Sequence, residues 1–469
     1  MLLANLLEEP DVRSPRDPSF LGSGLCEALF AAGVMLPTLF VVQLGSKAPA
    51  LSFALTLVWL AVRGRQALGG IARRWPLLLV PGFAVLSVVW SDYPSDTAKH
   101  AAELCLTVLG GLMLATSPAP AGAVAGVWGA FGLFMVVSFV LGKSIDMTSF
   151  TSGATDSAFA GLNGMKNLFG MQAAIAVLAS MFMLARSVAR KSLLFLLAAG
   201  ALLLIELYLV WVARSAGAVI GLFIAAAAFT VTASMGPLRP TGRIIGCCML
   251  ALLALTVGVL AYAFADAVAS GTMAVFHKDP TLTGRSYLWY RSNDFIHERP
   301  LLGRGFESFW VKGNTDAEGL WRYAGMDQRT AFNFHNTFIE LLIHFGIVGT
   351  ALTLLVFAFA FVQLFRRAIL EPNTTSAFYI GFIIFELSRT PVESLMPQSF
   401  DFATVLMFGG LGYGFEKLSL RAAAYRAELQ RIKRMAEVAI MSQTRQRPQP
   451  AREAWARRQS RGAGPQPLA

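Results

Sequence analysis

Residues 193–212 read LLFLLAAGALLLIELYLVWV, an apolar run interrupted by one ionisable side chain, Glu206. A helix needs roughly 20 apolar residues to cross a bilayer core about 30 Å thick. The run therefore predicts a membrane-spanning helix. A carboxyl group in the middle of such a helix is costly, so Glu206 is either a functional group or a structural one that is paired or protonated.

The composition of the whole chain agrees with that interpretation. Of 469 residues, 55% are hydrophobic and 14% are charged, whereas a soluble protein carries about 25% charged residues. Length alone would predict about three soluble domains, but a water-soluble core of this size could not bury so much apolar surface. The four cysteines lie in apolar runs without metal-ligand spacing, which favours a packing role. The sequence predicts an integral membrane protein.

Twelve apolar runs together predict an all-α, polytopic membrane protein with about 12 transmembrane helices. Acidic residues precede the first run, unlike the basic start of a cleavable signal peptide, so we expect this run to remain as the first helix. The runs cover residues 25–44, 48–62, 75–90, 98–116, 121–142, 167–185, 192–213, 216–235, 244–269, 335–365, 376–391 and 402–420.

Lys and Arg occur in alternate connections between these runs, and short loops that carry them prefer the cytoplasm. With twelve spans, both termini are then cytoplasmic. The net charge is +11, of which residues 416–469 contribute +8 through twelve Lys/Arg and four Asp/Glu. The rest of the chain is nearly neutral, which does not indicate a nucleic-acid-binding core. The basic tail is expected to be largely disordered and to lie near anionic lipid headgroups.

Two connections on the outer side are long, residues 143–166 and residues 270–334. Long loops in a compact fold usually carry function, and we expect the second, between helices 9 and 10, to be partly helical. The expected organisation is a cytoplasmic N-terminus (1–24), transmembrane helices 1–9 (25–269), a periplasmic substrate loop (270–334), transmembrane helices 10–12 (335–420) and a cytoplasmic tail (421–469).

The second outer loop and the helix after it carry an ordered series of motifs. This series resembles the shared region of the O-antigen ligase and Wzy-type polysaccharide polymerase superfamily, with its TGR, P-x-x-G-x-G-x-x-x-F, H-N-x-[FY]-[IL]-[EQ] and G-[IL]-[IV]-G segments. The matching stretches are TGR at 283–285, RPLLGRGFESF at 299–309, FHNTFIEL at 334–341 and FGIVG at 345–349.

Three stretches further upstream are also similar to that superfamily. Lys166-Asn167 resembles its H-K-N segment, although Met165 stands where the family has histidine. Residues 214–217 (RSAG) resemble a short Ser/Arg-rich corner, and residues 90–94 (WSDYP) an early outer loop. The resemblance is specific only in the block 283–349, and the tail beyond about residue 420 has no counterpart.

The resemblance implies a bacterial inner-membrane glycosyltransferase with a GT-C-like helical fold and an active site that faces the periplasm. Its donor would be a glycan linked to undecaprenyl pyrophosphate, and its second substrate an acceptor glycan. The pattern resembles exopolysaccharide or O-antigen polymerases more than ligases that transfer glycan to lipid A core. No cofactor and no metal ion are implied. Membrane lipids, a chain-length regulator (co-polymerase) and a flippase are the implied partners.

Three residues are the candidate catalytic groups under this resemblance. Arg285, beside Gly284, would clamp the pyrophosphate, because a guanidinium binds phosphate oxygens in a bidentate way. Arg214 would add a second positive charge at an outer corner, where basic residues are disfavoured. His335 would accept the proton of the acceptor hydroxyl, since imidazole suits general base catalysis near neutral pH, or would bind pyrophosphate. The alternatives are headgroup contacts for the arginines and a capping contact for the histidine.

Five further residues are candidate substrate contacts. Asn336 and Glu340, four apart, share a helix face and could orient the sugar or the histidine; Thr337 and Glu340 also fit a capping box. Lys166 lies at a helix start, where a cation is disfavoured by the dipole and therefore needs a reason. The substrate contacts are Lys166, Asn167, Asn336, Glu340 and Arg304, with Gly284 allowing close backbone approach.

Some ionisable residues have a structural reading or a competing functional one. Lys99 and His100 are further candidates, His344 is expected to pack internally, and Glu386 could pair with Arg389. Twelve spans with both ends inside would also suit a secondary transporter or flippase. A transporter places its ionisable residues near the bilayer midplane, whereas here they are expected at the outer face.

Overall fold

The computed structural model describes residues 24–148, 155–249, 285–326, 332–395 and 397–418, together with Arg431, Arg434, Met435 and Val438. The chain divides into two units, Met1–Lys417 and Leu418–Ala469. In the second unit, Arg431, Arg434, Met435 and Val438 are helical and exposed. The predicted N-terminus 1–24 therefore lies outside the described residues except for Gly24, as does most of the tail.

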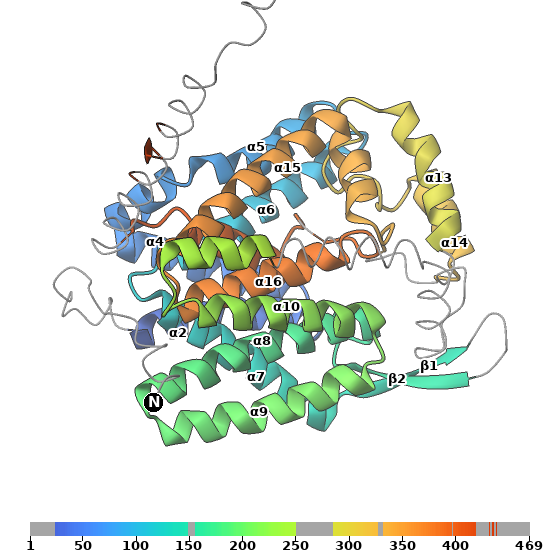
Figure 1. Ribbon diagram of the computed structural model, residues 1–469. Coiled ribbons are helices and arrows are strands. Elements are labelled where there is room, and N and C mark those ends of the chain that lie inside the picture. Colours follow the sequence, from blue (N-terminus) through green and yellow to red (C-terminus); the bar gives the residue numbers. More distant parts are fainter. Residues whose placement is uncertain are drawn as a thin grey trace, which may run out of the picture. The chain divides into compact units, whose positions relative to one another are not determined.

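The first unit is built from helices and one short hairpin (Figure 1). In its first half the elements are α2 (Gly24–Leu39), α3 (Val41–Leu44), α4 (Lys47–Ala72), the 3₁₀ helix η2 (Trp75–Leu78), α5 (Leu79–Leu86), the 3₁₀ helix η3 (Ser87–Val89), α6 (Pro94–Ala115) and α7 (Pro120–Leu141). The later elements are β1 (Lys143–Thr148), β2 (Thr155–Gly161), α8 (Lys166–Arg190), α9 (Leu193–Val212), α10 (Ala216–Ser234), α13 (Arg285–Glu298), α14 (Thr315–Tyr323), α15 (Thr337–Leu370), α16 (Thr374–Arg389) and α17 (Phe402–Tyr413).

The polytopic helical prediction is confirmed, with one exception to its all-α form. Residues 143–161 contain the antiparallel hairpin β1–β2, which occupies most of the first long outer loop. Six helices in the described residues are long and apolar enough to span a membrane: α6, α7, α8, α9, α10 and α15. A seventh span results if α4 and the segment Trp75–Val89, bent by 92°, cross together.

The count of twelve spans stays a prediction. Eleven of the twelve apolar runs contain helices that the structure describes in full or in large part. In the remaining run, residues 244–269, only residues 244–249 are described, and they are helical. Several of these helices are short, since α2 has 16 residues and α17 has 12. Apolar composition was read correctly there, but it does not determine how long a continuous helix becomes.

Helices distant in sequence pack in pairs around a common apolar core. α2 lies beside α7, α10 beside α16, and α6 beside α17. Among the six long apolar helices of the described residues, α8 is the most enclosed, with most of its central residues buried. Its small side chains, such as Ala173, Ala176 and Ala179, let neighbouring helices approach closely, as is usual where helices pack in a bilayer.

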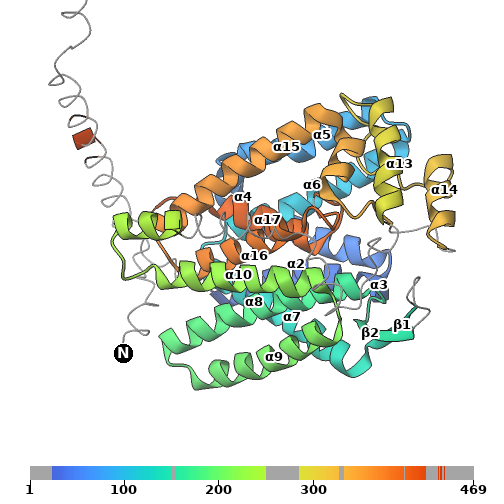
Figure 2. The same cartoon turned by 45° about the vertical axis from the view of Figure 1, so that its right-hand side comes forward.

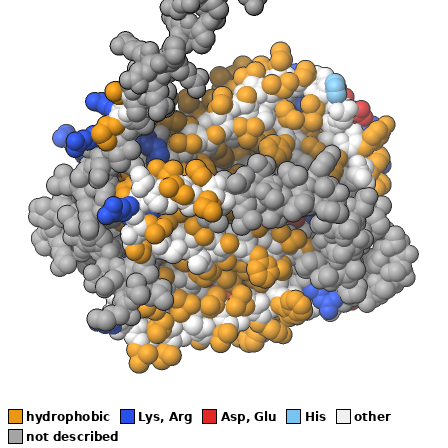
Figure 3. Space-filling view, in the orientation of Figure 1, with side chains coloured by type: hydrophobic (Ala, Val, Ile, Leu, Met, Phe, Trp, Pro, Cys, Tyr) orange, Lys and Arg blue, Asp and Glu red, His pale blue; other side chains and the backbone are white. Residues whose placement is uncertain are grey.

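Arginines join the carboxyl ends of several helices at one end of this bundle. Arg74 is fully buried and donates to the carbonyl oxygens of Gly70, Ala115 and Gly412, which end α4, α6 and α17. The last carbonyls of a helix lack intrahelical donors, and a guanidinium satisfies several of them at once. We call this the basic end; Figure 3 shows most of the visible Lys and Arg side chains on the left of the molecule.

Two more arginines extend the basic end to the remaining helices. Arg243 donates to the carbonyl oxygens of Met235 and Ile369, after α10 and near the end of α15. Arg367 in the last turn of α15 donates to the carbonyl of Glu416, whose carboxylate accepts from Arg74. The helices α6, α10, α15 and α17 therefore share one direction, and their amino ends meet at the opposite end, which we call the site end.

Helix α15 is broken near the site end at Gly346, whose φ is +61°. The loop at 300–305 lies in the break: Arg304 N donates to Ile343 O, Gly305 N to His344 O, and Ile347 N to Pro300 O. A Cβ at Gly346 would meet the backbone of Leu301 at 2.3 Å, so only glycine fits there. Two of the motifs seen in the sequence thus form one joint.

A small aromatic subdomain covers this joint. Helices α13 and α14 pack through Leu288, Phe295 and Trp321 against Phe309 and Phe334 from the adjoining loops. Figure 2 shows α13 and α14 side by side beside the near end of α15, at the same end of the bundle as the hairpin β1–β2. The subdomain and the hairpin therefore mark the site end.

Candidate active site

Three segments that are far apart in sequence bring Arg285, His335 and Glu393 together at the site end. Arg285 begins α13, His335 directly precedes the cap of α15, and Glu393 follows the end of α16. Arg285 Nη2 lies 3.2 Å from Glu393 Oε1, and His335 Nδ1 lies 3.4 Å from Glu393 Oε2. Arg285 Nη1 also donates to the carbonyl of Val392. One carboxylate thus holds both of the leading candidates from the sequence.

The backbone around His335 and Glu393 is fixed by a reciprocal set of hydrogen bonds. Asn336 caps α15, since its side-chain oxygen accepts from the backbone N–H of Phe338 and Ile339. Its amide donates to the carbonyl of Pro391, and the hydroxyl of Thr337 donates to the carbonyl of Glu393. The amino end of α15 and the loop after α16 therefore hold each other in place.

His335 itself has a left-handed backbone conformation, with φ at +52°. Such a conformation is uncommon for a residue with a side chain and persists only where the surroundings enforce it. Arg214 and Glu307 share this feature, with φ at +49° and +48°. Strained backbones of this kind occur preferentially at functional sites, which agrees with the assignment of His335 and Arg214 as candidates.

The electrostatics of the group keep Glu393 charged. Burial raises the pKa of this carboxyl, but the hydrogen bond to His335 and the charges of Arg285, His335 and Arg389 outweigh it and lower the pKa to about 2. Only 15% of the Glu393 side chain is exposed, against 11% for Arg285 and 27% for His335. The carboxylate is therefore a fixed negative charge between two cationic or polarisable groups.

A chain of contacts connects the upstream candidates Lys166, Asn167 and Arg214 to the group around Glu393. Ser215 donates to Asn167 at 3.2 Å, which joins the amino ends of α8 and α10. A Cβ at Gly217 in the first turn of α10 would lie 3.9 Å from Arg389 Nε, and Arg389 acts on Glu393. Lys166 and Arg214 flank the Asn167–Ser215 contact in sequence, so their segments reach the same end as Arg285 and His335.

Glu340 has a different local role from the one expected. It was expected to cap α15 with Thr337 or to contact the sugar, but Asn336 provides the cap. Glu340 Oε1 accepts from the backbone N–H of Phe334 at 2.7 Å, and its other oxygen lies 3.3 Å from His344 Nε2. The capping box was therefore wrong, because the helix begins at Thr337, one residue earlier than that motif requires. A sugar contact by Glu340 stays a prediction.

Arg304 lies inside a cluster of carboxylates. Its guanidinium is 3.7 Å from Asp92, 3.4 Å from Asp316, and bonded to Glu298. It also lies over the ring of Phe295 at 5.4 Å. This geometry ties the early outer loop, α13 and α14 together, and it accounts for Arg304 without a substrate, whose contact with this residue stays a prediction.

Two further expectations have a clear structural outcome. Gly284 lies outside the described residues, so its approach to a substrate is not described. Glu386 and Arg389 do not form an ion pair: among the described residues, both Glu386 oxygens lack a hydrogen-bond partner, and the Arg389 guanidinium lies 4.9 Å from the ring of Phe385.

Within the described ranges, no three His, Cys, Asp or Glu side chains are grouped to hold a metal ion.

Comparison with known proteins agrees with the arrangement of motifs. Residues 173–354 match a family model described as O-antigen ligase. The chain is 28% identical over 364 residues to the exopolysaccharide production protein ExoQ of Rhizobium meliloti (strain 1021), covering 74% of this chain and 78% of that protein.

The chain is therefore similar to the O-antigen ligase and Wzy-type polysaccharide polymerase superfamily, in the part of the sequence that carries most of the motifs described above. Members of the superfamily are glycosyltransferase-like enzymes of polysaccharide assembly that act on lipid-linked oligosaccharides. Together with the apolar helices, the similarity supports a multi-pass membrane protein. The matched segment contains Arg214, Arg285 and His335 but ends before Glu393.

Glu393 is the residue that sequence reasoning missed. It follows α16 in the stretch Thr390-Pro391-Val392-Glu393, which carries none of the superfamily motifs quoted above. The available signal was its position: an acidic residue just beyond an apolar helix on the predicted outer side. That signal is weak, because acidic residues are ordinary in outer loops and only the fold shows which one meets the histidine.

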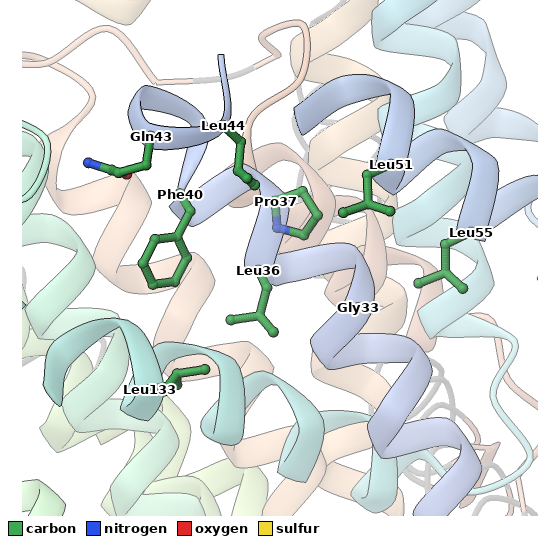
Figure 4. Close-up of a pocket in the computed structure, with 9 residues that line it drawn as sticks. All are labelled: Gly33, Leu36, Pro37, Phe40, Gln43, Leu44, Leu51, Leu55 and Leu133. Atoms are coloured by element: carbon green, nitrogen blue, oxygen red, sulfur yellow. The ribbon is translucent and has the colours of Figure 1, made fainter. Parts of the chain in front are cut away.

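An apolar groove lies beside the site end, between α2, α4 and α7 (Figure 4). Its volume is about 430 Å³, and Gln43 is its one side chain with a polar amide. The Gln43 amide donates to the carbonyl of Leu162, in the turn that leads to Lys166. The groove is lined by Gly33, Leu36, Pro37, Phe40, Gln43, Leu44, Leu51, Leu55 and Leu133.

Proposed function

We propose that this protein is an inner-membrane glycosyltransferase that polymerises repeat units of an exopolysaccharide or O-antigen, using a glycan linked to undecaprenyl pyrophosphate as donor. The observation that carries the proposal is the shared carboxylate: Glu393 binds Arg285 through one oxygen and faces His335 with the other. This geometry supports the proposal because it brings together a guanidinium that could bind phosphate and an imidazole that could accept a proton.

The proposed reaction is one displacement at the anomeric carbon of the donor glycan. The acceptor hydroxyl attacks this carbon and forms the new glycosidic C–O bond, while the bond from the carbon to the pyrophosphate oxygen breaks. The proton of the hydroxyl moves to His335, and the electron pair of the broken bond leaves with the undecaprenyl pyrophosphate. General base catalysis of this kind contributes about 10²–10⁴-fold to a rate.

Glu393 supports that proton transfer. With Nδ1 of His335 directed at the carboxylate, the second ring nitrogen is left to accept the proton. A carboxylate in this position fixes the tautomer and orientation of the imidazole and stabilises the imidazolium that forms. Because the Glu393 pKa is about 2, the carboxylate stays charged over the whole physiological range.

Fixed positive charge supports binding of the pyrophosphate. Arg285 uses Nη1 and Nη2 on Val392 and Glu393, and a guanidinium has five donors in total, so it can bind phosphate oxygens as well. Arg214 and Lys166 belong to segments at the same end. The amino ends of α6, α8, α10, α15 and α17 also meet there, and helix amino ends favour anions. The arginines supply charge that a divalent cation would otherwise provide.

The two ends of the molecule support the proposed orientation. The basic connections meet at one end, which the preference of Lys and Arg loops assigns to the cytoplasm. The site end, with the hairpin and the aromatic subdomain, would then face the periplasm. The apolar groove between α2, α4 and α7 would take the isoprenoid tail there, since it adjoins the turn before Lys166.

The similarity to an exopolysaccharide production protein supports a polymerase over a ligase. The relative is an exopolysaccharide production protein, and an exopolysaccharide is not attached to lipid A core. A growing glycan is therefore the acceptor that we propose.

The decisive experiment examines glycans in a null strain that expresses Arg285→Ala, Arg214→Ala or His335→Ala. Loss of long chains with normal lipid-linked single units would support a polymerase. Loss of glycan on lipid A with intact lipid-linked chains would identify a ligase. Lipid-linked units trapped on the cytoplasmic side would instead indicate a flippase, and wild-type ladders from all three variants would remove the assigned site.

A further inference from the structure

A second imidazole–carboxylate pair lies at the site end. His100, in the second turn of α6, has its Nδ1 3.6 Å from Oε2 of Glu307. The two side chains are 24% and 21% exposed, which is close to the 27% and 15% of His335 and Glu393. The site end therefore has two His–Glu pairs of similar exposure, but only His335 is hydrogen-bonded to its carboxylate, while His100 Nδ1 lies close to Glu307 without a hydrogen bond. The mechanism above uses only the first pair.

The second pair is attached to the same loop as the first. Glu307 accepts from the backbone N–H of Ser399 at 2.8 Å and from its hydroxyl at 2.6 Å. Ser399 lies in the loop from α16 to α17, six residues after Glu393. This loop therefore connects the two carboxylates: one contacts His335 and Arg285, and the other contacts His100.

A buried third pair lies between them on α15. Glu340 and His344 approach to 3.3 Å, and Glu340 is 8% exposed. Glu340 is linked to the first pair through Ser394, whose hydroxyl lies 3.4 Å from Oε1 and accepts from Asn336 N. The charge of Glu307 also acts on the carboxyl group of Glu340. The first and second pairs are thus two sides of one polar region.

Several polar atoms of this region have no hydrogen-bond partner within the described ranges. They are Glu340 Oε2, His344 Nε2 and His100 Nδ1, all of them buried. A buried polar atom in a folded protein normally has a partner, either protein, water or ligand. A hydroxyl group both donates and accepts hydrogen bonds, so a ligand rich in hydroxyls can bind to carboxylates and imidazoles of this kind.

The charges distinguish the two sides. The Arg285 side carries guanidinium groups and suits a pyrophosphate. The side of His100 and Glu307 has Glu103 and Asp401 within electrostatic range, so it would repel a phosphate. A glycan without phosphate is the part of the two substrates that fits an acidic, hydroxyl-binding surface.

We infer that His100 and Glu307 form the subsite for the acceptor glycan and bind hydroxyls of the sugar whose attacking hydroxyl reaches His335. The inference rests on the proposed function, because it assigns the second substrate of that reaction. His100 and Glu307 bind and orient the acceptor, and they take no part in the proton transfer.

The test uses the purified full-length protein in phospholipid vesicles. The donor is a lipid-pyrophosphate-linked glycan, and the acceptor is a repeat-unit oligosaccharide with a neutral aglycone, which cannot act as donor. His100→Gln and Glu307→Gln are expected to raise the acceptor KM by about tenfold or more, the size of one lost hydrogen bond to a charged group. The donor KM should stay within about twofold of wild type on the same reasoning.

The matched controls are His297→Gln and Asp294→Asn, which remove an imidazole and a carboxylate from the exposed face of α13. They should leave both KM values unchanged. An unchanged acceptor KM in both test variants, or a raised donor KM, would overturn the inference. A wild-type protein without any transfer would instead contradict the proposed function, so the two failures are distinguishable.

A measurement on the wild-type protein covers the case in which Glu307→Gln does not fold. Diethyl pyrocarbonate modifies accessible histidines, and mass spectrometry gives the rate at His100. Saturating acceptor should slow this rate at least several-fold, whereas donor alone should not. Equal rates with and without acceptor would contradict the subsite.

Discussion

The basic end and the site end both gather arginines, but they use them differently. At the basic end, Arg74 and Arg243 donate hydrogen bonds to backbone carbonyls at the ends of helices. At the site end, Arg285 meets a carboxylate and a histidine where helices begin. The basic-end arginines close the bundle, while Arg285 stands where the helix dipoles already favour an anion. Helix direction, more than residue type, separates the arginines that cap helix ends from the arginine that we propose to bind the substrate.

The largest effect on activity is expected at the imidazole, which has no equivalent at the basic end. His335→Ala should lower the transfer rate by about 10³-fold, because the acceptor hydroxyl loses its base. The fold should be retained, since the His335 ring is partly exposed. Turnover of the purified variant measures this, with His297→Ala as control. Near wild-type turnover would show that His335 is not the base.

Removal of the Arg285 guanidinium should come next. Arg285→Ala should lower kcat/KM for the donor by about 10²–10³-fold, the usual cost of losing a group that stabilises developing charge. Arg291→Ala on the same helix, which removes a surface pair with Asp294 and a ring contact with Phe295, should leave the donor KM and kcat close to wild type. Donor titration distinguishes the two. An Arg285→Ala enzyme with an unchanged donor KM and kcat would break the distinction between the two ends.

Neutralising Glu393 should have a smaller effect on activity and a distinctive effect of pH. Glu393→Gln should cost about 10- to 100-fold in kcat, because the imidazole loses its orienting charge. The folded-state pKa of Glu393, about 2, lies below its ordinary value of 4.5. Its contribution to stability is therefore present above about pH 4.5 and is lost as the pH falls toward 2.

Thermal unfolding between pH 6 and pH 3 checks the second part of that expectation. The wild-type melting temperature should fall more steeply than that of Glu393→Gln, since only the wild type loses the stabilising carboxylate as it becomes protonated. Parallel curves would contradict the lowered pKa.

The smallest effect on activity, and a large one on stability, is expected at the basic end. Arg74→Gln removes a buried guanidinium that bonds three carbonyls and Glu416. It should destabilise the protein by about 3 kcal/mol, the scale for breaking a buried charged network. The folded fraction should keep its specific activity within about twofold, which a thermal melt and a turnover assay on the same sample would measure.

The sequence predicted the helical membrane fold, because apolar runs are local patterns. It also predicted three of the residues at the site end, Arg214, Arg285 and His335, because the RSAG, TGR and H-N motifs are local as well. It did not identify Glu393, whose importance depends on a loop that folds back against the start of α15. It also missed the hairpin β1–β2, because the alternation in β1 is limited to Ile145 and Met147 and β2 has no matching pattern. The capping box failed for a similar reason, since Thr337 and Asn336 compete for the same cap and only geometry decides.

The break in α15 has a mechanical consequence for how substrates reach the site. Four backbone hydrogen bonds stitch residues 300–305 into that break, the fourth from Val348 to Leu301. Residues 300–305 cannot move away from α15 without breaking these four hydrogen bonds, so this segment forms a fixed wall of the site rather than a lid. Under the proposed function, a glycan and its lipid carrier would therefore enter from the membrane-facing side of the bundle.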